Sequence, residues 1–356
     1  MKNFFIDGFK HFKESKIVTK IFVILGFLLY IFLMCISIIK VNVEVLTPGS
    51  LSYTAQSVEI VDGNDVGKIY TVGVYDHIKV SLLQYWLSKA DENMDIYEYN
   101  EKTDLSSTDN TKLGVISKEI SINNALINAY DEASKIDSTI HLEKTYRGVI
   151  VGGIYPYSKC DLEYADIITK VGGNTFNNYS EYVALVKSYA SESGVTFTVI
   201  RNNIEKEVFA YFVAYPSNEE LKVLGITVYD YYKLDSEKST PKFNIVDEYT
   251  SIGSSGGAML SLSIYNALLK EDCTKNNIIV GTGVINLDGT IGAIGGVKQK
   301  VITAMSYDID IFFVVSDNYE EALKTYNEIG ATYKLVKIKN FSDIIDYLNN
   351  VEEKNE

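Results

Sequence analysis

Residues 251–269 read SIGSSGGAMLSLSIYNALL, a run of small Gly and Ser residues that leads directly into an apolar stretch. The apolar part predicts a helix that is hydrophobic nearly all round and therefore buried. Small residues before such a helix leave backbone N–H groups free at its positive end. These groups would stabilise an oxyanion if Ser255 attacked a carbonyl. Capping of the helix by Ser254 or Ser255 explains the same pattern equally well, so this segment alone supports both interpretations.

A second glycine-rich segment follows this helix. Residues 280–300 read VGTGVINLDGTIGAIGGVKQK, which predicts a strand, a hairpin turn, a second strand and a Gly295-Gly296 hinge that opens a helix. Lys300 falls within the first turns of that helix. By itself, a lysine in such a place is typical of an exposed helix surface.

The positions of the histidines restrict the class of serine enzyme. His11, His77 and His141 all precede Ser255. An α/β-hydrolase nucleophile elbow requires a histidine after the serine, which excludes that class. A trypsin-like order of His, Asp and Ser is formally open through His77 or His141. It fits poorly, because a long buried helix after the serine does not suit an all-β protease.

Together the two segments resemble the proteolytic domain of the Lon family, in which a serine motif precedes a strand motif and a lysine at a similar separation. The resemblance covers roughly residues 221–350 and implies an α/β fold. Near its start, the patterns at 226–232 and 243–249 predict strands. It places the family's nucleophile on Ser255 and its lysine on Lys300, not on Lys298. A serine hydroxyl is a weak nucleophile until a base takes its proton, and the neutral lysine would be that base.

The resemblance also implies supporting residues. Thr282 matches the threonine of the strand motif, whose hydroxyl would hydrogen-bond the lysine amine. The backbone around Ser255, Gly256 and Gly257 would supply the oxyanion donors. The sequence departs from the family at three positions: Ser254 replaces proline, Gly256 replaces alanine, and Ile252 stands where many members carry an acid. The extra backbone freedom at Ser254 and Gly256 predicts a less preorganised oxyanion hole.

Residues 142–215 resemble a PDZ domain. The match rests on RGVIVGGI at 147–154, on YADIITKVGG at 164–173, and on the helix and strands expected after them, although Ala165 stands where glycine is usual. PDZ domains add a peptide as an extra strand and hold its terminal carboxylate with backbone N–H groups. The resemblance implies a peptide-binding loop made by Arg147, Gly148, Val149 and Ile150. A vestigial groove in a domain that only spaces the active site is the alternative.

An uncharged apolar stretch at residues 21–39 lies between Lys20 and Lys40. At about 1.5 Å per residue, this length spans roughly the 30 Å hydrocarbon core of a bilayer. No small-residue cleavage pattern follows it, so an uncleaved transmembrane helix is predicted. Lysines concentrate in residues 1–20, which predicts a cytoplasmic N-terminus and an extracytoplasmic remainder in a single-pass protein of the cell membrane.

Residues 41–140 carry no catalytic motif, and we expect them to connect the span to the domains that follow. Their pattern predicts strands at 41–45 and 68–74, with a turn at Pro48-Gly49 after the first strand. A polar run at 91–109 predicts a loop, and residues 122–133 have helical periodicity.

Composition excludes several partners. The formal net charge of -14 argues against nucleic acid, because few groups would neutralise phosphates. No Cys/His cluster has the spacing of a metal site, so no metal is predicted. Residues 63–69 read GNDVGKI, one residue short of a P-loop and without Ser or Thr after the lysine. We therefore expect neither a nucleotide nor any other cofactor.

The sequence thus predicts an α/β and β-rich multidomain protein with one N-terminal transmembrane helix, a PDZ-like domain and a Lon-like proteolytic domain. The predicted function is an ATP-independent, membrane-anchored serine endopeptidase with a Ser–Lys dyad, whose PDZ domain presents peptides or unfolded proteins. A catalytically degenerate adaptor that binds chain ends through its PDZ groove is the main alternative. The family resemblance also allows a homo-oligomer.

Overall fold

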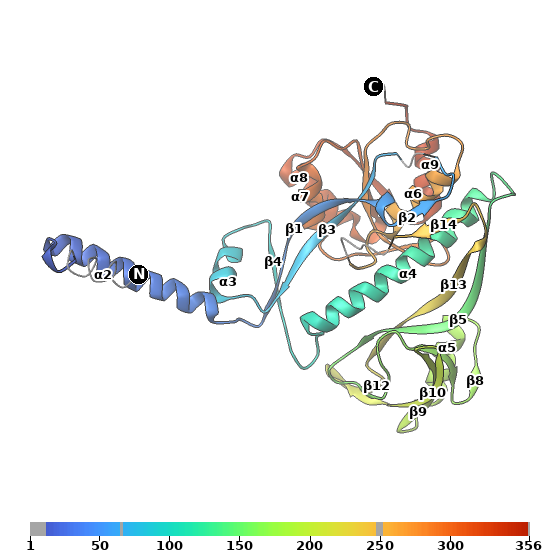
Figure 1. Cartoon of the computed structure of the whole chain (residues 1–356), viewed down its shortest axis with the longest axis horizontal. Coiled ribbons are helices and arrows are strands. Elements are labelled where there is room, and N and C mark those ends of the chain that lie inside the picture. The colour runs from blue at the N-terminus through green and yellow to red at the C-terminus, as the bar shows by residue number, and fades with distance from the viewer. Residues whose placement is uncertain (1–11, 65–66, 247–251, 355–356) are drawn as a thin grey trace. The chain divides into compact units, whose positions relative to one another are not determined.

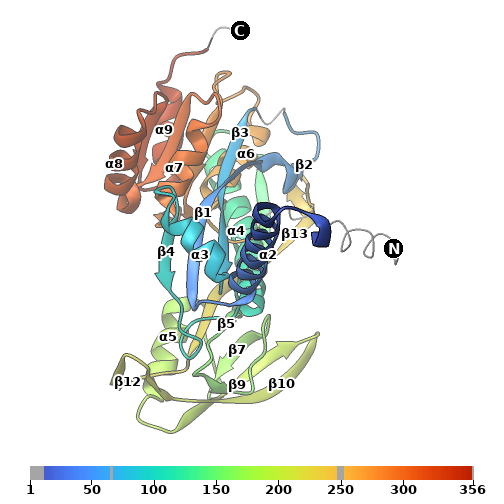
Figure 2. The ribbon, with the colours of Figure 1, turned by 90° about the vertical axis from the view of Figure 1, so that its left-hand side faces the viewer.

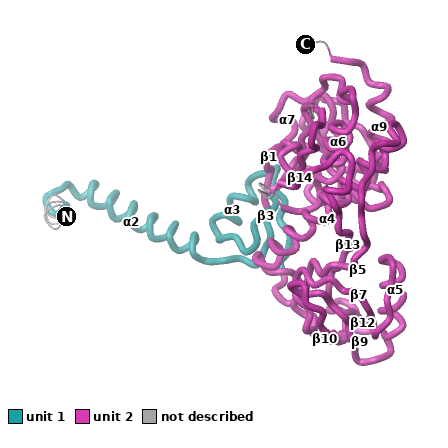
Figure 3. Tube along the Cα trace, turned by 45° about the vertical axis from the view of Figure 1, so that its right-hand side comes forward, with its two compact units in different colours: residues 1–46, 76–99 teal, residues 47–75, 100–356 magenta. Residues whose placement is uncertain are grey.

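The computed structural model describes residues 12–64, 67–246 and 252–354. The chain folds as two compact units, shown in Figure 3. One comprises Met1–Leu46 and Asp76–Tyr99, and the other comprises Thr47–Tyr75 and Asn100–Glu356. Strands β1 (Val43–Tyr53) and β3 (Ile69–Ile78) contribute residues to both units. Some predictions fall outside the described residues: the lysine-rich start of the chain within 1–11, the centre of the GNDVGKI run at 65–66, and the end of a strand predicted at 243–249.

The smaller unit contains helices α2 (Ile17–Ile38) and α3 (Leu82–Lys89) and strand β4 (Asp95–Glu98). Strand β4 pairs antiparallel with the first residues of β1. Among the described residues, α2 is the helix that is long and apolar enough to cross a membrane, and it includes nearly all of the predicted stretch at 21–39. Apart from Ile36, its side chains are largely exposed.

A mostly parallel sheet organises the larger unit. Its order is β19 (Lys334–Ile338), β18 (Ile311–Val315), β15 (Ile279–Thr282), β3 and β1. The pairs β19–β18, β18–β15 and β15–β3 are parallel. Strand β18 is buried along its whole length, as expected for a parallel strand covered on both faces.

Helices cover both faces of this sheet. On one face, Ile311 and Phe313 of β18 join a core with α6 (Gly257–Leu268) and α9 (Phe341–Asn349). On the other face, Phe312 and Val314 of β18 pack with α7 (Val297–Met305) and α8 (Tyr319–Ile329). Alternate side chains of this one strand therefore pack into the two cores on opposite faces of the sheet. The antiparallel hairpin of β16 (Val284–Ile285) and β17 (Ile291–Gly292) follows β15, as predicted.

Residues 41–140 form part of the fold and do not only connect α2 to the domains that follow. Strands β1 and β3 enter the sheet that contains β15, and the long helix α4 (Ser107–Ala133) packs against α6 and against strand β5 (His141–Ile154), as Figure 1 shows. The predicted helix at 122–133 is confirmed as the C-terminal half of α4. The predicted loop at 91–109 is wrong, since it contains β4 and the start of α4. Its polar residues cap the helix instead: the Ser106 hydroxyl accepts a hydrogen bond from the Asp109 N–H at 3.1 Å.

The turn predicted at Pro48-Gly49 is also wrong, because both residues lie inside β1. The glycine serves close packing. A Cβ at Gly49 would lie 2.3 Å from the carbonyl oxygen of Gly73 in β3. A residue that indicates a turn in sequence therefore marks a close approach of two strands here.

An antiparallel sheet forms the second part of the larger unit, visible at the bottom of Figure 2. Its order is β13 (Ile226–Thr240), β5, β7 (Ile167–Val171), β9 (Gly194–Arg201), β10 (Ile204–Tyr211) and β6 (Lys159–Cys160), with β8 (Asn174–Thr175) beside β7. Helix α5 (Tyr179–Ser188) packs on its core. The strand predicted at 226–232 extends to Thr240 and pairs with β5 rather than with the sheet of β15. Two further antiparallel pairs join β11 (Val213–Tyr215) to β12 (Asn218–Val223) and β2 (Val58–Ile60) to β14 (Phe243–Ile245).

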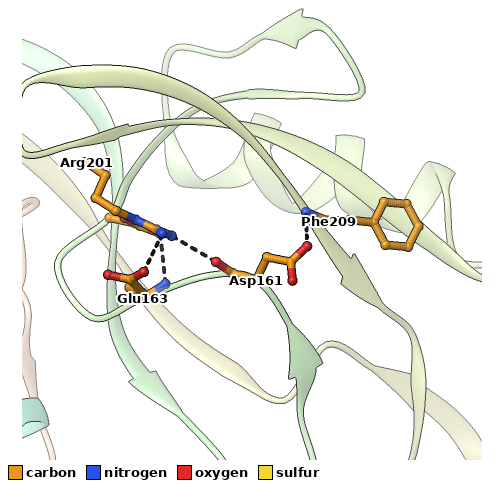
Figure 4. A network of polar contacts seen from close by, with 5 residues as sticks. Asp161, Glu163, Arg201 and Phe209 are labelled. Atoms are coloured by element: carbon orange, nitrogen blue, oxygen red, sulfur yellow. Dashed lines mark hydrogen bonds and ion pairs between the residues drawn. The ribbon is translucent and has the colours of Figure 1, made fainter.

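A buried ion pair ties the loop before β7 to strand β9. Both carboxylate oxygens of Asp166, which is 1% exposed, accept hydrogen bonds from Arg201, through Nε at 2.7 Å and Nη2 at 2.6 Å. Figure 4 shows that Arg201 also reaches the Glu163 carboxylate and the Asp161 carbonyl. A two-pronged contact of this kind is specific to arginine, which explains one of the few arginines in a lysine-rich chain.

Ala165 provides a test of backbone strain. Its φ is 67°, in the left-handed region, at the position where the PDZ pattern usually has glycine. A left-handed conformation costs a non-glycine residue about 1–2 kcal/mol. We expect Ala165→Gly to raise the free energy of unfolding by about 0.5–1 kcal/mol, measured by urea denaturation. The gain is smaller than the strain itself, because glycine loses more conformational entropy on folding than alanine does. The control Ala184→Gly, on the exposed face of α5, should lower it by about 1 kcal/mol. A loss of stability at both positions would contradict strain at Ala165.

Candidate active site

The candidate nucleophile lies at the start of α6, held by the end of β15. The carbonyl oxygen of Ser255 accepts hydrogen bonds from the Gly283 N–H at 2.7 Å and from the Thr282 hydroxyl at 3.1 Å. The Ala258 N–H donates back to the Gly283 carbonyl at 3.1 Å. Three backbone or hydroxyl contacts therefore fix this segment against one strand end.

Neither serine caps the helix. Helix α6 has Gly256 at its N-cap position, with no side-chain capping hydrogen bond. Of the two interpretations that the sequence left open, capping by Ser254 or Ser255 is therefore wrong. The Ser255 hydroxyl is instead directed at the amine of Lys300.

Lys300, from the second glycine-rich segment, contacts Ser255 of the first. Its Nζ lies 2.9 Å from Ser255 Oγ and 2.9 Å from Thr282 Oγ1. Helix α7 begins after Gly296, whose φ of 67° makes the sharp entry that a glycine allows. Lys300 follows in the first helical turns and is only 2% exposed, unlike a surface helix lysine. The contact with Thr282 that the Lon resemblance implied is present.

Burial changes the acid–base chemistry of this amine. Removal of the ammonium from water lowers the pKa of Lys300 from 10.5 to about 7. The N-terminal end of α7 acts in the same direction, because its partial positive charge disfavours a nearby cation. Near neutral pH, a large fraction of Lys300 is therefore uncharged. A neutral amine can accept the proton of the Ser255 hydroxyl.

The glycines around the serine are explained by packing. A Cβ on Gly257 would lie 2.6 Å from the Ser121 hydroxyl and from an Ile285 methyl group, and a Cβ on Gly256 would lie 2.9 Å from the Thr71 hydroxyl. The Gly257 N–H already donates to the Ser254 carbonyl at 3.1 Å. Of the expected oxyanion donors, Gly257 is therefore engaged within the chain in this conformation. The N–H groups of Ser255 and Gly256 precede it in the same turn.

Sequence motifs missed two residues that shape the site. Ser121 of α4 donates its hydroxyl to the Ser254 carbonyl at 3.3 Å, and Thr71 of β3 lies against Gly256. Both belong to the part of the chain expected only to connect. A signal for α4 exists in hindsight: Gly114, Ser121 and Ala125 are small residues spaced to share one helix face, which permits close approach of another segment.

A cavity of about 320 Å³ lies beside the same helix face. Asn124, one turn after Ser121 in α4, lines it and donates to the Ile285 carbonyl at 3.0 Å. Tyr179, Tyr229 and Asp230 line its other side, from α5 and β13. The cavity therefore borders both the antiparallel sheet and the hairpin that follows β15.

Comparisons with known proteins match the part of the chain that contains this site. Residues 249–350 match the family model of the Lon protease (S16) C-terminal proteolytic domain. The chain carries a Lon-type proteolytic domain. The Lon protease of Campylobacter jejuni subsp. jejuni serotype O:2 is 30% identical over 119 residues, which cover 30% of this chain and 15% of that protein. The Lon protease of Metamycoplasma arthritidis is 29% identical over 102 residues, 29% of this chain and 12% of that one. The chain thus spans only a small part of the length of these relatives.

Two solved structures are similar to part of the chain. The PDZ domain of the SdrC-like protein from Listeria monocytogenes is 20% identical, with a TM-score of 0.21, and covers 24% of this chain and 90% of that one. GtR34C from Geobacillus thermodenitrificans is 25% identical, with a TM-score of 0.20, covering 23% and 95%. We call the part of the chain from β5 to β13 the PDZ-like domain, because its sequence resembles that family.

The expected peptide-binding loop requires a correction. Arg147, Gly148, Val149 and Ile150 lie inside strand β5, not in a loop. Both edges of this strand are paired at Val149 and Ile150, with β13 on one side and β7 on the other. Gly148, with a φ of 123°, serves a close approach, since a Cβ there would lie 2.1 Å from the Ile168 carbonyl oxygen. At Val149 and Ile150, an added peptide strand would therefore have to displace β13 or β7.

The His141 side chain lies beside an acidic residue, not beside Ser255. The His141 side chain is exposed and lies 3.5 Å from Glu143. His11 lies outside the described residues. Within residues 12–64, 67–246 and 252–354, no group of three His, Cys, Asp or Glu side chains has the geometry of a metal site.

The pKa of Lys300 predicts how Ser255 reacts. A fluorophosphonate probe should label Ser255 faster as pH rises, with a half-maximal rate near pH 7, because only the neutral amine can take the hydroxyl proton. Intact-mass measurement of the adduct at a series of pH values tests this. Lys300→Arg, which stays charged, should abolish labelling. A midpoint near the ordinary lysine value of 10.5 would contradict a buried amine.

Proposed function

We propose that the protein is an ATP-independent serine endopeptidase in which Ser255 is the nucleophile and Lys300 the general base. The observation that carries the proposal is the 2.9 Å contact between Lys300 Nζ and Ser255 Oγ in a buried setting. The Lon-type domain supports a peptidase of the serine class. The incomplete P-loop-like run at 63–69 supports independence from ATP.

The reaction would proceed through an acyl-enzyme. Neutral Lys300 takes the Ser255 proton as Oγ attacks the substrate carbonyl, and the resulting ammonium then gives a proton to the departing amine. A water that loses its proton to Lys300 hydrolyses the ester and frees Ser255. Thr282 Oγ1 accepts a hydrogen bond from the Lys300 amine and so orients it. The Thr282 hydroxyl also donates to the backbone carbonyl of Ser255 and so holds the nucleophile in place. The N–H groups of Ser255 and Gly256 would donate hydrogen bonds to the oxyanion.

Loss of either dyad member tests the mechanism. Ser255→Ala and Lys300→Met should each reduce cleavage of fluorescently labelled unfolded casein by at least about 10³-fold, because the two groups act as one unit. Peptide mapping of the products reports the bonds cut.

His141→Ala is the control, since this side chain is exposed and lies beside Glu143. It should retain full activity. If His141→Ala abolished cleavage while Lys300→Met did not, the trypsin-like alternative would replace the dyad. If wild-type protein gave neither cleavage nor a covalent adduct on Ser255, the degenerate adaptor would be the better description.

We further propose that the PDZ-like domain presents substrate along β13 and α5 instead of along β5. Strand β13 ends the order of its sheet and lines the cavity beside α4, whereas β5 is paired on both edges. Tyr179 lines this cavity and a neighbouring one of about 370 Å³ between α5 and β13. Peptides or unfolded chains would thus reach Ser255 over a surface shared by both domains.

Tyr179 allows this path to be tested. Tyr179→Ala should raise KM for a protein substrate several-fold and leave kcat unchanged, because binding is weakened without altering the dyad. Tyr211→Ala, an equally exposed tyrosine on β10 that lines neither cavity, should change neither constant. An unchanged KM in Tyr179→Ala would contradict the proposed path.

Helix α2 would anchor the protein in the cell membrane, with the N-terminus cytoplasmic and both domains outside. Support comes from the length of α2, from its exposed apolar surface and from the lysines that precede it.

A further inference from the structure

Helix α3 lies against the C-terminal end of α2. The Leu82 N–H donates to the Ile39 carbonyl at 2.8 Å, and Lys40 forms a β-bridge with Ser81. Further along, the ring centroids of Trp86 in α3 and Phe32 in α2 are 6.4 Å apart. All these residues belong to the smaller unit, so α3 folds back along the last turns of α2.

The surface that α3 leaves open is apolar. Leu83, Trp86 and Leu87 have the i, i+3, i+4 spacing that places side chains on one helix face. Trp86 is 46% exposed and Leu87 is 62% exposed, while Ser81 and Ser88 are buried. Within α3, the small polar Ser88 is therefore buried, while the large apolar side chains of Trp86 and Leu87 are exposed together with Gln84 and Lys89. A nearby tyrosine, Tyr97 of β4, is exposed as well.

The contact with α2 determines how deep this apolar face would lie in a bilayer. Phe32 precedes the last residue of α2 by six positions, which corresponds to about 9 Å along the helix axis. Helices that lie in a membrane surface bury their apolar face by about 5–10 Å. If α2 crosses the bilayer, Trp86 therefore lies where headgroups meet acyl chains. Tryptophan and tyrosine are enriched at this level, because their rings are apolar with one polar edge.

We propose that α3 is a membrane-surface helix that inserts Trp86 and Leu87 into the phospholipid leaflet beside the exit of α2. The inference rests on the proposed membrane anchoring by α2 and extends it to a second point of contact. Charges near the face are mixed, with Lys79 and Lys89 offset by Asp91 and Glu92. Insertion is therefore driven by apolar contact and does not require anionic lipid.

Trp86 reports on its own environment, because it is the single tryptophan of the chain. The experiment uses the full chain reconstituted in phosphatidylcholine vesicles whose acyl chains carry bromine either near the carbonyl or near the methyl end. We expect blue-shifted emission, and stronger quenching by the shallow bromine than by the deep one. The quenching should persist in high salt. Water-like emission that neither lipid quenches would overturn the proposal. Blue-shifted emission without quenching would overturn it as well, and would indicate that a protein or a second copy covers α3.

Two comparisons separate this inference from the anchor itself. Protein that floats with the vesicles while Trp86 stays unquenched refutes the role of α3 and leaves α2 as the anchor. Protein that does not float refutes both. In the variant Leu87→Asp, quenching should fall while flotation persists. Leu221→Asp, at an exposed leucine of β12, should alter neither measurement.

Discussion

The candidate site depends on the burial of one lysine amine beside one serine hydroxyl. Lowering the pKa of Lys300 from 10.5 to about 7 corresponds to roughly 5 kcal/mol of discrimination against its charged form. Such a cost is sustained only where the surrounding packing is fixed. Helix α7 supplies the amine, β15 supplies Thr282, and the start of α6 supplies Ser255. The parallel sheet holds these three elements together through the cores on its two faces.

Segments on both sides of the PDZ-like domain build this arrangement. Strand β3 and helix α4 precede that domain in sequence. They place Thr71 against Gly256 and Ser121 against the Ser254 carbonyl. The PDZ-like domain is therefore inserted between two segments of the chain that belong to one fold. Its first and last strands, β5 and β13, pair with each other. This topology explains why both edges of β5 are paired at Val149 and Ile150. The strand that leads back to the peptidase fold occupies one edge, and β7 occupies the other.

The sequence predicted those features that a local pattern specifies. The apolar run after Gly257 predicted the buried helix α6, and the glycine hinge at 295–296 predicted the entry to α7. Similarity to the Lon family indicated Lys300 rather than Lys298, which periodicity alone could not have chosen. Local signals failed where one residue serves two purposes. Gly49 and Gly148 resemble turn or loop residues, yet each lies in a strand where a neighbouring backbone leaves no room for a Cβ.

By itself, the sequence predicted an apolar helix able to span a membrane, the order of two domains, and the residues of a Ser–Lys pair. Tertiary structure decided whether Ser255 and Lys300 meet, which strand edge is open, and which side of α3 faces outward. These outcomes depend on contacts between segments far apart in the chain. Hydrophobic periodicity shows that a face is buried or apolar, but it carries no information about which partner covers that face.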